Sequence, residues 1–302
     1  MSDFEELRKK MIENAKKGIT ESYASEEYAL MQAIAAYLQL SKSYNLLSER
    51  LSEWFGLYVP ELKVQSQKQL IELSTAFAEG KVDNESIASI LGSESNYRDV
   101  VKKINSTIGR KSKEEEKKVF AEFARLGRMT SAVLDSLEGY ITAAANRIMP
   151  NVTYLTDAKI AAELLSKAGS LERLALMPAG TIQVLGAEKA LFKHIKFGSK
   201  PPKYGILFKL PKISSGRRDI RGKIARLYAT KISIAVKADY FSKHFIAKEL
   251  KASLDDSIKR IESEPEKKRT EGTRRERNGR RRYSSGRHKR SNYINLASGK
   301  SP

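Results

Sequence analysis

The chain has 302 residues, of which 40% are hydrophobic and 30% charged, so it is long enough to bury a core beneath a heavily charged surface. Lys and Arg outnumber Asp and Glu by 56 to 36, and the resulting formal net charge of +20 favours a polyanionic partner. Because the sequence has no cysteine, widely separated histidines and no apolar run of membrane-spanning length, we expect no disulfide, no metal site and no contact with a membrane.

The N-terminal residues 1–27 are expected to form a connecting helix. Phe4, Leu7, Met11 and Ile12 recur at helical spacing among charged residues. The first six residues are acidic and lack the apolar stretch of a signal peptide. A cytoplasmic location follows by default, or a nucleolar one in a eukaryote.

Residues 28–150 are expected to form an antiparallel coiled-coil domain. Two stretches place apolar residues alternately four and three positions apart, which is heptad spacing, and Pro60 and Pro150 end them. A globular helical bundle is the alternative, because the two seams also contain serine and threonine. Residues 61–112 between them carry short helical patterns broken by glycines, a tip module without assignable chemistry. The apolar seam residues are Leu30, Ile34, Tyr37, Tyr44, Leu51, Phe55, Val119, Phe123, Leu126, Val133 and Leu137.

Residues 151–264 are expected to form a compact helical domain, which makes the predicted fold class all-α. Short apolar helices are predicted at 158–165, 171–176, 187–197 and 222–241. The last is so continuously apolar that we expect it at the centre of the domain.

Residues 265–302 are expected to form a disordered basic tail, because they offer almost no apolar surface to offset the entropy of ordering. Between 265 and 290 twelve Lys and Arg face three Glu, a net charge of +9. The rest of the positive charge must therefore lie in the body of the protein.

The most informative segment leads from Met177 to Lys189. An apolar, strand-like or turn segment reaches Gly186, and helix formers resume at Ala187. The N–H groups at such a helix start can bind phosphate, and Lys189 in the first turn could reach the same anion. An ordinary helix start preceded by a glycine would give the same pattern.

A basic loop with aromatic residues follows at 193–205. Its diproline stiffens the chain, which lowers the entropy lost when Lys200 and Lys203 are held against a phosphate backbone. Tyr204 or His194 could stack on an unpaired base. A solvated loop with a packed tyrosine is an equally good interpretation of these residues.

The start of the expected central helix carries a basic run, because residues 217–226 contain four Arg and one Lys. Lys223 and Arg226 are three positions apart and share a helix face. A charge run often marks only a solvated helix end. Here it joins the basic loop in the same small domain, which favours a basic patch.

The sequence contains none of the common catalytic signatures. There is no G-x-S-x-G, no phosphate-binding loop ending in G-K-[S/T], no G-x-G-x-x-G, and no carboxylate pair with a histidine as an acid–base team. We therefore expect a binding protein, not an enzyme, with no cofactor of its own.

Taken together, these segments resemble the Nop family, in particular the archaeal Nop proteins of box C/D ribonucleoproteins. The resemblance runs from about residue 20 to 255 and is carried by Pro150-Asn151-Val152-Thr153, Ala168-Gly169-Ser170-Leu171, Met177-Pro178-Ala179, the run from Ile182 through Gly186-Ala187-Glu188-Lys189 to Phe192, Pro201-Pro202-Lys203 and Arg221-Gly222-Lys223-Ile224-Ala225-Arg226.

The resemblance implies a scaffold of guide-directed RNA 2′-O-methylation. In this family the Nop domain binds a kink-turn RNA once a small kink-turn-binding protein, homologous to a ribosomal protein, occupies it. The coiled coil mediates self-association, which gives the seam residues that role and predicts a homodimer. An N-terminal domain recruits fibrillarin, so that S-adenosylmethionine would belong to that partner. The implied RNA-binding residues, with the basic positions around them, are Gly186, Ala187, Glu188, Lys189, Lys196, Lys200, Lys203, Tyr204, Arg217, Arg221, Lys223 and Arg226.

The chain departs from the family pattern in three places. Lys200 stands before the diproline where arginine is usual, and Tyr204 stands where we expect histidine. Lysine lacks the bidentate fork of arginine, so a phosphate contact there should be looser. The domain that docks fibrillarin is expected to be absent, because only about 28 residues precede the first seam. A general basic nucleic-acid-binding protein, or a splicing-type assembly protein without a methylation role, is the alternative.

Overall fold

The computed structural model describes residues 2–92 and 97–265, and every regular element in those ranges is helical. The predicted all-α fold class is confirmed. The predicted tail from residue 266 onward lies outside the described residues. The strand-like segment expected before Gly186 is wrong, because residues Ala179–Val184 form the short helix α10.

The N-terminal region consists of two consecutive helices, α1 (Ser2–Tyr23) and α2 (Glu26–Tyr58). Ser25 separates them in an extended conformation, and its hydroxyl oxygen accepts the N–H of Glu27. Serine at this position satisfies an N–H group that a helix start would otherwise leave without an acceptor. The described side chains of α1 are all exposed, so its amphipathic pattern is not used for packing within the chain.

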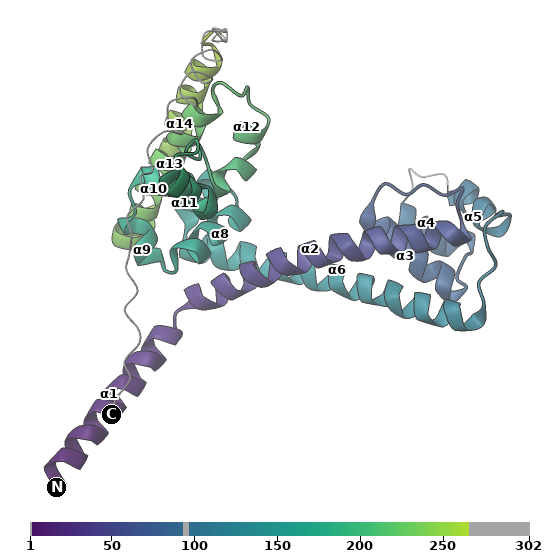
Figure 1. The fold of residues 1–302 in the computed structure, drawn as a ribbon, viewed down its shortest axis with the longest axis horizontal. Coiled ribbons are helices and arrows are strands. Elements are labelled where there is room, and N and C mark those ends of the chain that lie inside the picture. Colours follow the sequence, from purple (N-terminus) through teal and green to yellow (C-terminus); the bar gives the residue numbers. More distant parts are fainter. Residues whose placement is uncertain (1, 93–96, 266–302) are drawn as a thin grey trace, which may run out of the picture. The chain divides into compact units, whose positions relative to one another are not determined.

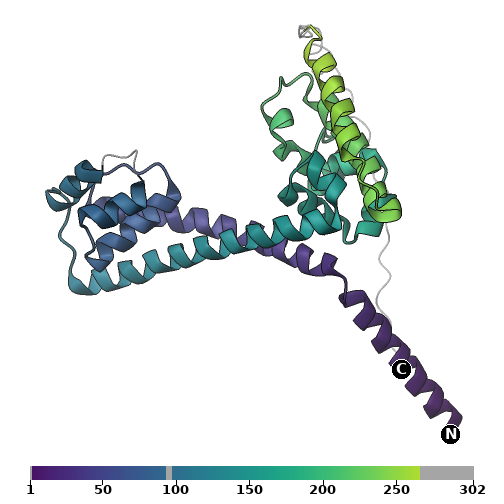
Figure 2. The same cartoon turned by 180° about the vertical axis from the view of Figure 1, so that it is seen from behind.

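Helix α2 pairs antiparallel with α6 (Glu114–Ile148), and the two helices run side by side in both views of the ribbon (Figures 1 and 2). Leu30, Ile34, Leu51 and Phe55 of the predicted first seam are buried in this packing. Pro60 and Pro150 lie just beyond the ends of the two helices, as predicted.

The predicted seam of α6 is wrong by one position at Val119, Leu126 and Val133, which are exposed, whereas Phe120, Ala124 and Gly127 are buried. Thr130 and Ala144, which also belong to the predicted heptad spacing, are buried as expected. Small residues explain the shift, because they carry little hydrophobic signal but allow a neighbouring helix to approach closely. A Cβ at Gly127 would lie 3.3 Å from the side chain of Ile71 in α3 (Gln67–Glu79).

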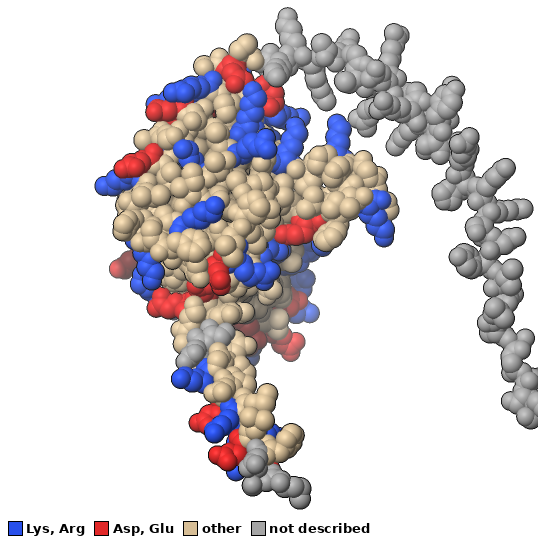
Figure 3. All heavy atoms as spheres, turned by 90° about the vertical axis from the view of Figure 1, so that its left-hand side faces the viewer, with Lys and Arg blue, Asp and Glu red and all other residues tan. Residues whose placement is uncertain are grey.

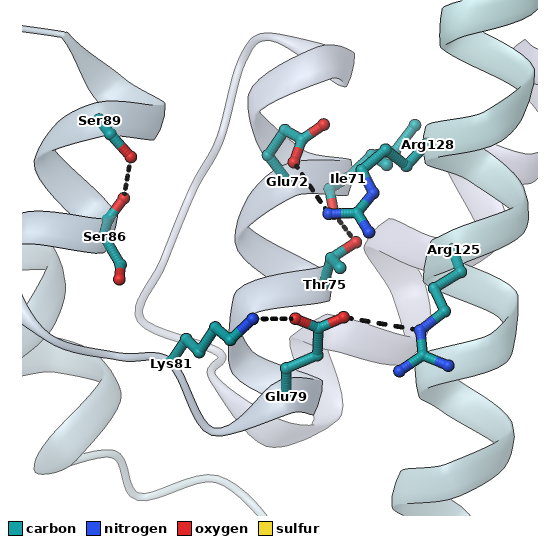
Figure 4. Close-up of polar contacts among 9 residues, drawn as sticks. All are labelled: Ile71, Glu72, Thr75, Glu79, Lys81, Ser86, Ser89, Arg125 and Arg128. Atoms are coloured by element: carbon teal, nitrogen blue, oxygen red, sulfur yellow. Dashed lines mark hydrogen bonds and ion pairs between the residues drawn. The ribbon is translucent and has the colours of Figure 1, made fainter.

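Helix α3 packs along α6 as a third helix of this half of the chain, and polar pairs fix it there. Figure 4 shows Glu79 between Lys81 and Arg125, at 3.0 and 3.5 Å, and Glu72 directed at Arg128. The two cations lower the pKa of the Glu79 carboxyl, with the hydrogen bond from Lys81 as the largest cause.

Two shorter helices, α4 (Asn84–Leu91) and α5 (Tyr97–Asn105), complete the region between α2 and α6. A cluster of aromatic rings packs in the core of this region. The ring centroids of Trp54 and Phe120 are 5.3 Å apart, and those of Tyr58 and Phe77 are 5.6 Å apart. This core is distinct from the one that continues into the C-terminal half.

The C-terminal half is assembled from short helices around α13 (Arg221–Lys237). They are α7 (Pro150–Leu155), α8 (Ala158–Ala168), α9 (Leu171–Leu176), α10, α11 (Glu188–Phe197), η1 (Ile206–Lys209), α12 (Pro211–Ser214), η2 (Ala238–Ser242) and α14 (Ala247–Glu262). Ile224, Ile232 and Val236 of α13 are fully buried, which confirms its predicted central place (Figure 1). The sequence interpretation did not foresee helix α14.

Two polar clusters set how these elements meet. Lys159 of α8 donates to Glu138 of α6 at 2.9 Å and lies 3.5 Å from the Tyr37 hydroxyl of α2, so it joins three helices. Deeper inside, Asp239 of η2 accepts hydrogen bonds from Asn151 at the start of α7. Burial raises the pKa of the Asp239 carboxyl.

Candidate nucleic-acid interface

The positive charge of the body is concentrated in one segment. Residues 177–226 contain twelve Lys and Arg but only Glu188 and Asp219 as acids, a net charge of +10. Since the tail segment 265–290 holds a further +9 of the total of +20, little surplus remains elsewhere. Lys and Arg side chains form a dense group in the upper part of the face seen in Figure 3.

The turn between α10 and α11 is built on Gly186. Its φ of +87° is a conformation that side chains disfavour, and a Cβ there would stand 2.6 Å from Ile206. Gly186 is therefore approached closely by Ile206 of the same chain. That the N–H groups of this helix start bind phosphate stays a prediction, but Gly186 and Ala187 do not contribute to it. The N–H of Gly186 donates to Glu188 Oε1 at 2.7 Å, and that of Ala187 to the carbonyl of Val184 at 2.9 Å.

The basic loop that follows α11 folds back onto this turn. The N–H groups of Gly205 and Ile206 donate to the carbonyls of Gln183 and Leu185, at 3.0 and 2.8 Å. The side-chain amide of Gln183 returns a 2.7 Å hydrogen bond to the carbonyl of Lys203. These three bonds hold the exposed Lys203 beside the turn whose helix carries the exposed Lys189.

The same loop is joined to the start of α13 through aromatic contacts. The rings of Tyr204 and Phe208 stack with centroids 4.8 Å apart, and the guanidinium of Arg221 lies 5.7 Å from the Phe208 ring. Tyr204 is therefore half-buried with one face occupied, as in the packed-tyrosine interpretation. His194 is likewise engaged, because its ring hydrogen-bonds the carbonyl oxygen of Ser199.

Several predicted cations reach this surface from α13 and from the loop before it. A Cβ on Gly222 would lie 3.8 Å from the side chain of Lys203, so the loop and the start of α13 are neighbours. Lys223 and Arg226 are exposed, while Arg217 pairs with Asp219 at 3.7 Å. Lys200 is exposed too, and Lys196 is exposed on the same helix, α11, as Lys189.

Helix α11 contributes a surface that the sequence interpretation missed. It has no buried residue, and the side chains of Phe192 and Ile195 are 70% and 71% exposed. Lys189, Lys193 and Lys196 share the adjacent face, at spacings of four and three. The helix thus presents an apolar and a basic face side by side. The lysine spacing was the available signal that this helix is not internal.

The predicted self-association residues fall into three groups. Leu30, Ile34, Leu51 and Phe55 are buried within the chain. Tyr37, Tyr44, Phe123 and Leu137 are half-buried. Val119, Leu126 and Val133 are exposed at successive heptad positions of α6, together with Met129 and Tyr140. We define the exposed apolar stripe of α6 as Val119, Leu126, Met129, Val133 and Tyr140. A second chain could contact this stripe.

The described part of the chain shows neither a metal-binding cluster nor a membrane-spanning helix. Residues 2–92 and 97–265 contain no group of three or more Asp, Glu or His side chains placed to hold a metal ion. None of the helices described there combines the length and apolar character that crossing a bilayer needs.

Comparison with known proteins places this geometry in a family. Residues 36–260 match the Nop family, described as a snoRNA-binding domain with fibrillarin. The chain belongs to the Nop family. The match covers the α2–α6 pair as well as the C-terminal half, so the basic surface and the paired helices form parts of one family fold.

The Nop-family chain is similar to proteins of archaea and eukaryotes. It is 37% identical to an uncharacterised NOP5-family protein of Methanocaldococcus jannaschii, covering 86% of this chain and 64% of that protein. It is 33% identical to nucleolar protein 56 of Dictyostelium discoideum, covering 86% and 51%. One chain of a crystal structure of a fibrillarin/Nop5p complex aligns with a TM-score of 0.49 and 25% identity, covering 85% and 78%. The chain spans about half to two thirds of the length of the first two relatives.

Proposed function

We propose that this Nop-family chain is a non-catalytic RNA-binding scaffold of a box C/D-type ribonucleoprotein. It would recognise a kink-turn RNA already bound by its primary protein and support guide-directed 2′-O-methylation by fibrillarin. The observation that carries the proposal is the folded basic segment 177–226. Hydrogen bonds hold Lys203 beside the α10–α11 turn. The side chain of Lys203 also lies near Gly222 at the start of α13, where further exposed cations lie.

Helix α11 supports a composite ligand of RNA and protein. Its basic face, with Lys189 and Lys193, suits phosphates, which attract Lys and Arg and release counterions on contact. The adjacent Phe192 and Ile195 suit an apolar surface on a protein, since exposed apolar area of this kind usually marks a protein contact. A ligand that offers both surfaces, as a protein-bound kink-turn does, would use both faces.

The remaining partners follow from the family. Fibrillarin would supply the methyl transfer and bind S-adenosylmethionine, and this chain would position the RNA. The exposed apolar stripe of α6 would join two copies in a homodimer. A general basic nucleic-acid-binding protein remains the second candidate, favoured by the concentration of charge in the segment 265–290.

A gel-shift experiment separates the two candidates. The full chain is added to a kink-turn RNA with and without its primary binding protein, and a further shift is expected only when that protein is present. Deleting residues 265–302 should leave this specificity intact and reduce the dependence of affinity on salt. A chain that shifts the bare RNA equally well, and loses binding with the tail, is a general nucleic-acid binder instead.

A further inference from the structure

A pair of aromatic rings lies on the surface where α7 meets the segment between η2 and α14. The ring centroids of Tyr154 and Phe245 are 5.6 Å apart with an interplanar angle of 85°, and the two side chains are 50% and 51% exposed. Phe241 of η2, four residues before Phe245, is 63% exposed. Exposed aromatic rings that lie together, as Tyr154 and Phe245 do, suit a contact with another molecule.

The backbone on both sides of Phe245 is fixed by one buried side chain. Asn151, which precedes Tyr154 by three residues on α7, donates to the carbonyl of His244 at 2.8 Å and accepts the N–H of Ile246 at 2.7 Å. Asp239 holds Asn151 in turn, with a 2.7 Å bond to the side-chain amide. Because the rings are in place before a ligand arrives, little conformational entropy is lost when it binds.

Exposed lysines lie close in sequence to this pair of rings. In the segment 237–248, Lys237, Lys243 and Lys248 are exposed, whereas the one carboxylate, Asp239, is buried. Lys243 also adopts a left-handed φ of 55°, a conformation that residues with a side chain seldom hold and that recurs at binding sites. The exposed acids Glu249 and Asp157 lie just beyond the pair of rings in sequence.

Exposed aromatic rings among lysines are the combination that binds single-stranded nucleic acid, in which bases stack on the rings and the lysines approach the phosphates. The perpendicular arrangement lets a base stack on one ring and meet the edge of the other. The lysines favour a polyanion over a purely apolar protein surface.

We propose that Tyr154 and Phe245, with Lys243 and Lys248, form a second RNA contact that takes an unpaired base of a single strand. The contact uses α7 and the segment after η2, whereas the basic segment 177–226 supplies the proposed kink-turn surface. The inference goes beyond the proposed function, because a kink-turn scaffold does not require a site for single-stranded RNA.

The test uses the full chain with an oligouridylate. Ultraviolet crosslinking followed by peptide mapping should place uridine on the peptides that contain Tyr154 or Phe245. Tyr154→Ala and Phe245→Ala should each weaken binding about fivefold or more. Phe245→Leu should weaken it similarly, because leucine keeps apolar surface but offers no ring. The control is Phe4→Ala in α1, an exposed aromatic elsewhere, which should bind as the unaltered chain does.

The outcomes distinguish this inference from the proposed function. The ring variants should keep the wild-type melting temperature and the kink-turn gel shift. Wild-type binding by Phe245→Leu, or crosslinks confined to 177–226 and the tail, would overturn the second contact and leave the kink-turn proposal standing. Crosslinks at Tyr154 in a chain that gives no further shift of the protein-bound kink-turn would overturn the kink-turn proposal alone.

Discussion

Gly205 lies so close to Leu185 that a Cβ on the glycine would stand 1.9 Å from the leucine carbonyl oxygen. The contact joins the basic loop to the turn before α11, and the backbone bonds from Gly205 and Ile206 to Gln183 and Leu185 depend on it. The geometry of the surface proposed to bind RNA therefore depends on Gly205, although this residue contributes no charge to that surface.

Replacing this glycine should open the loop. We expect Gly205→Ala to lower the free energy of unfolding by about 1–3 kcal/mol, as overpacking of a close contact does, and to weaken binding of the protein-bound kink-turn. Gly180→Ala in α10 is the matched control, because nothing lies within 4 Å of a Cβ there. The control should be neutral or slightly stabilising in denaturant unfolding. Equal stability of the two variants would contradict the tight contact.

Charge reversal on the basic surface should weaken assembly without unfolding the chain. Lys189→Glu and Lys203→Glu alter exposed residues, so their melting temperatures should match the wild type. Each should reduce affinity for the protein-bound kink-turn and flatten its salt dependence, since one phosphate contact is lost. Lys42→Glu alters an exposed residue of α2 and is the control. It should change the affinity and its salt dependence much less than the other two variants do. A melting temperature lowered to that of a core variant would show that the two lysines are structural.

Removing the buried carboxylate of Asp239 should destabilise the C-terminal half. Asp239→Ala would leave the backbone N–H groups of Asn151 and Val152 without their acceptor. An unsatisfied buried donor costs about 1–3 kcal/mol, so we expect a loss of about 2–4 kcal/mol in denaturant unfolding. Asp239→Asn, which keeps one acceptor oxygen, should lose less. Equal losses in the two variants would mean that the hydrogen bonds are not the cause.

The loop between α5 and α6 should make stability depend on pH through Glu61. The N–H of Ile108 and the hydroxyl of Thr107 donate to this carboxylate at 2.7 and 2.8 Å, and they lower its pKa below the ordinary 4.5. A lowered pKa means that the ionised group stabilises the fold above about pH 4.5, and that this contribution is lost as the pH falls further. Glu61→Gln should therefore melt lower than the wild type at neutral pH, with the gap closing in acid. A gap that does not change with pH would rule out the carboxylate as its source.

The exposed apolar stripe of α6 should determine whether the chain self-associates. In analytical ultracentrifugation we expect the wild type to be dimeric and a Leu126→Glu/Val133→Glu double variant to be monomeric. The melting temperature of the variant should equal that of the wild type diluted until it is monomeric. Leu46→Glu, an exposed apolar position on α2, is the control and should remain dimeric. A double variant that still forms dimers would place the interface elsewhere.

Periodicity predicted the long helices and the burial of Leu30 and Phe55, because large apolar residues at heptad spacing carry a strong signal. It placed part of the α6 seam one residue away, with Leu126 in place of Gly127, because glycine contributes no hydrophobic signal although Ile71 packs against it. Periodicity alone does not distinguish a six-residue helix from a strand, and the segment that forms α10 was therefore expected to be strand-like or a turn.

The candidate site was predictable in its residues but not in its geometry. The lysines and arginines of 177–226 stand out in the sequence, yet their proximity depends on contacts such as the hydrogen bond from the Gln183 side-chain amide to the carbonyl of Lys203, twenty residues away. Sequence also did not show that Gly186 and Ala187 donate within their own turn. The apolar pattern predicted the helix at 187–197 but not its exposure, because periodicity shows which face is apolar but not which molecule covers it.

The aromatic cluster between α2 and α6 contains the chain's single tryptophan, Trp54, with Phe120 and Phe123 on either side. Its emission reports on that core alone, whereas the C-terminal half contributes only tyrosine and phenylalanine to the spectrum. Exciting the indole and monitoring far-ultraviolet ellipticity in the same melt would therefore reveal whether the two cores unfold together or in sequence. No label would have to be introduced.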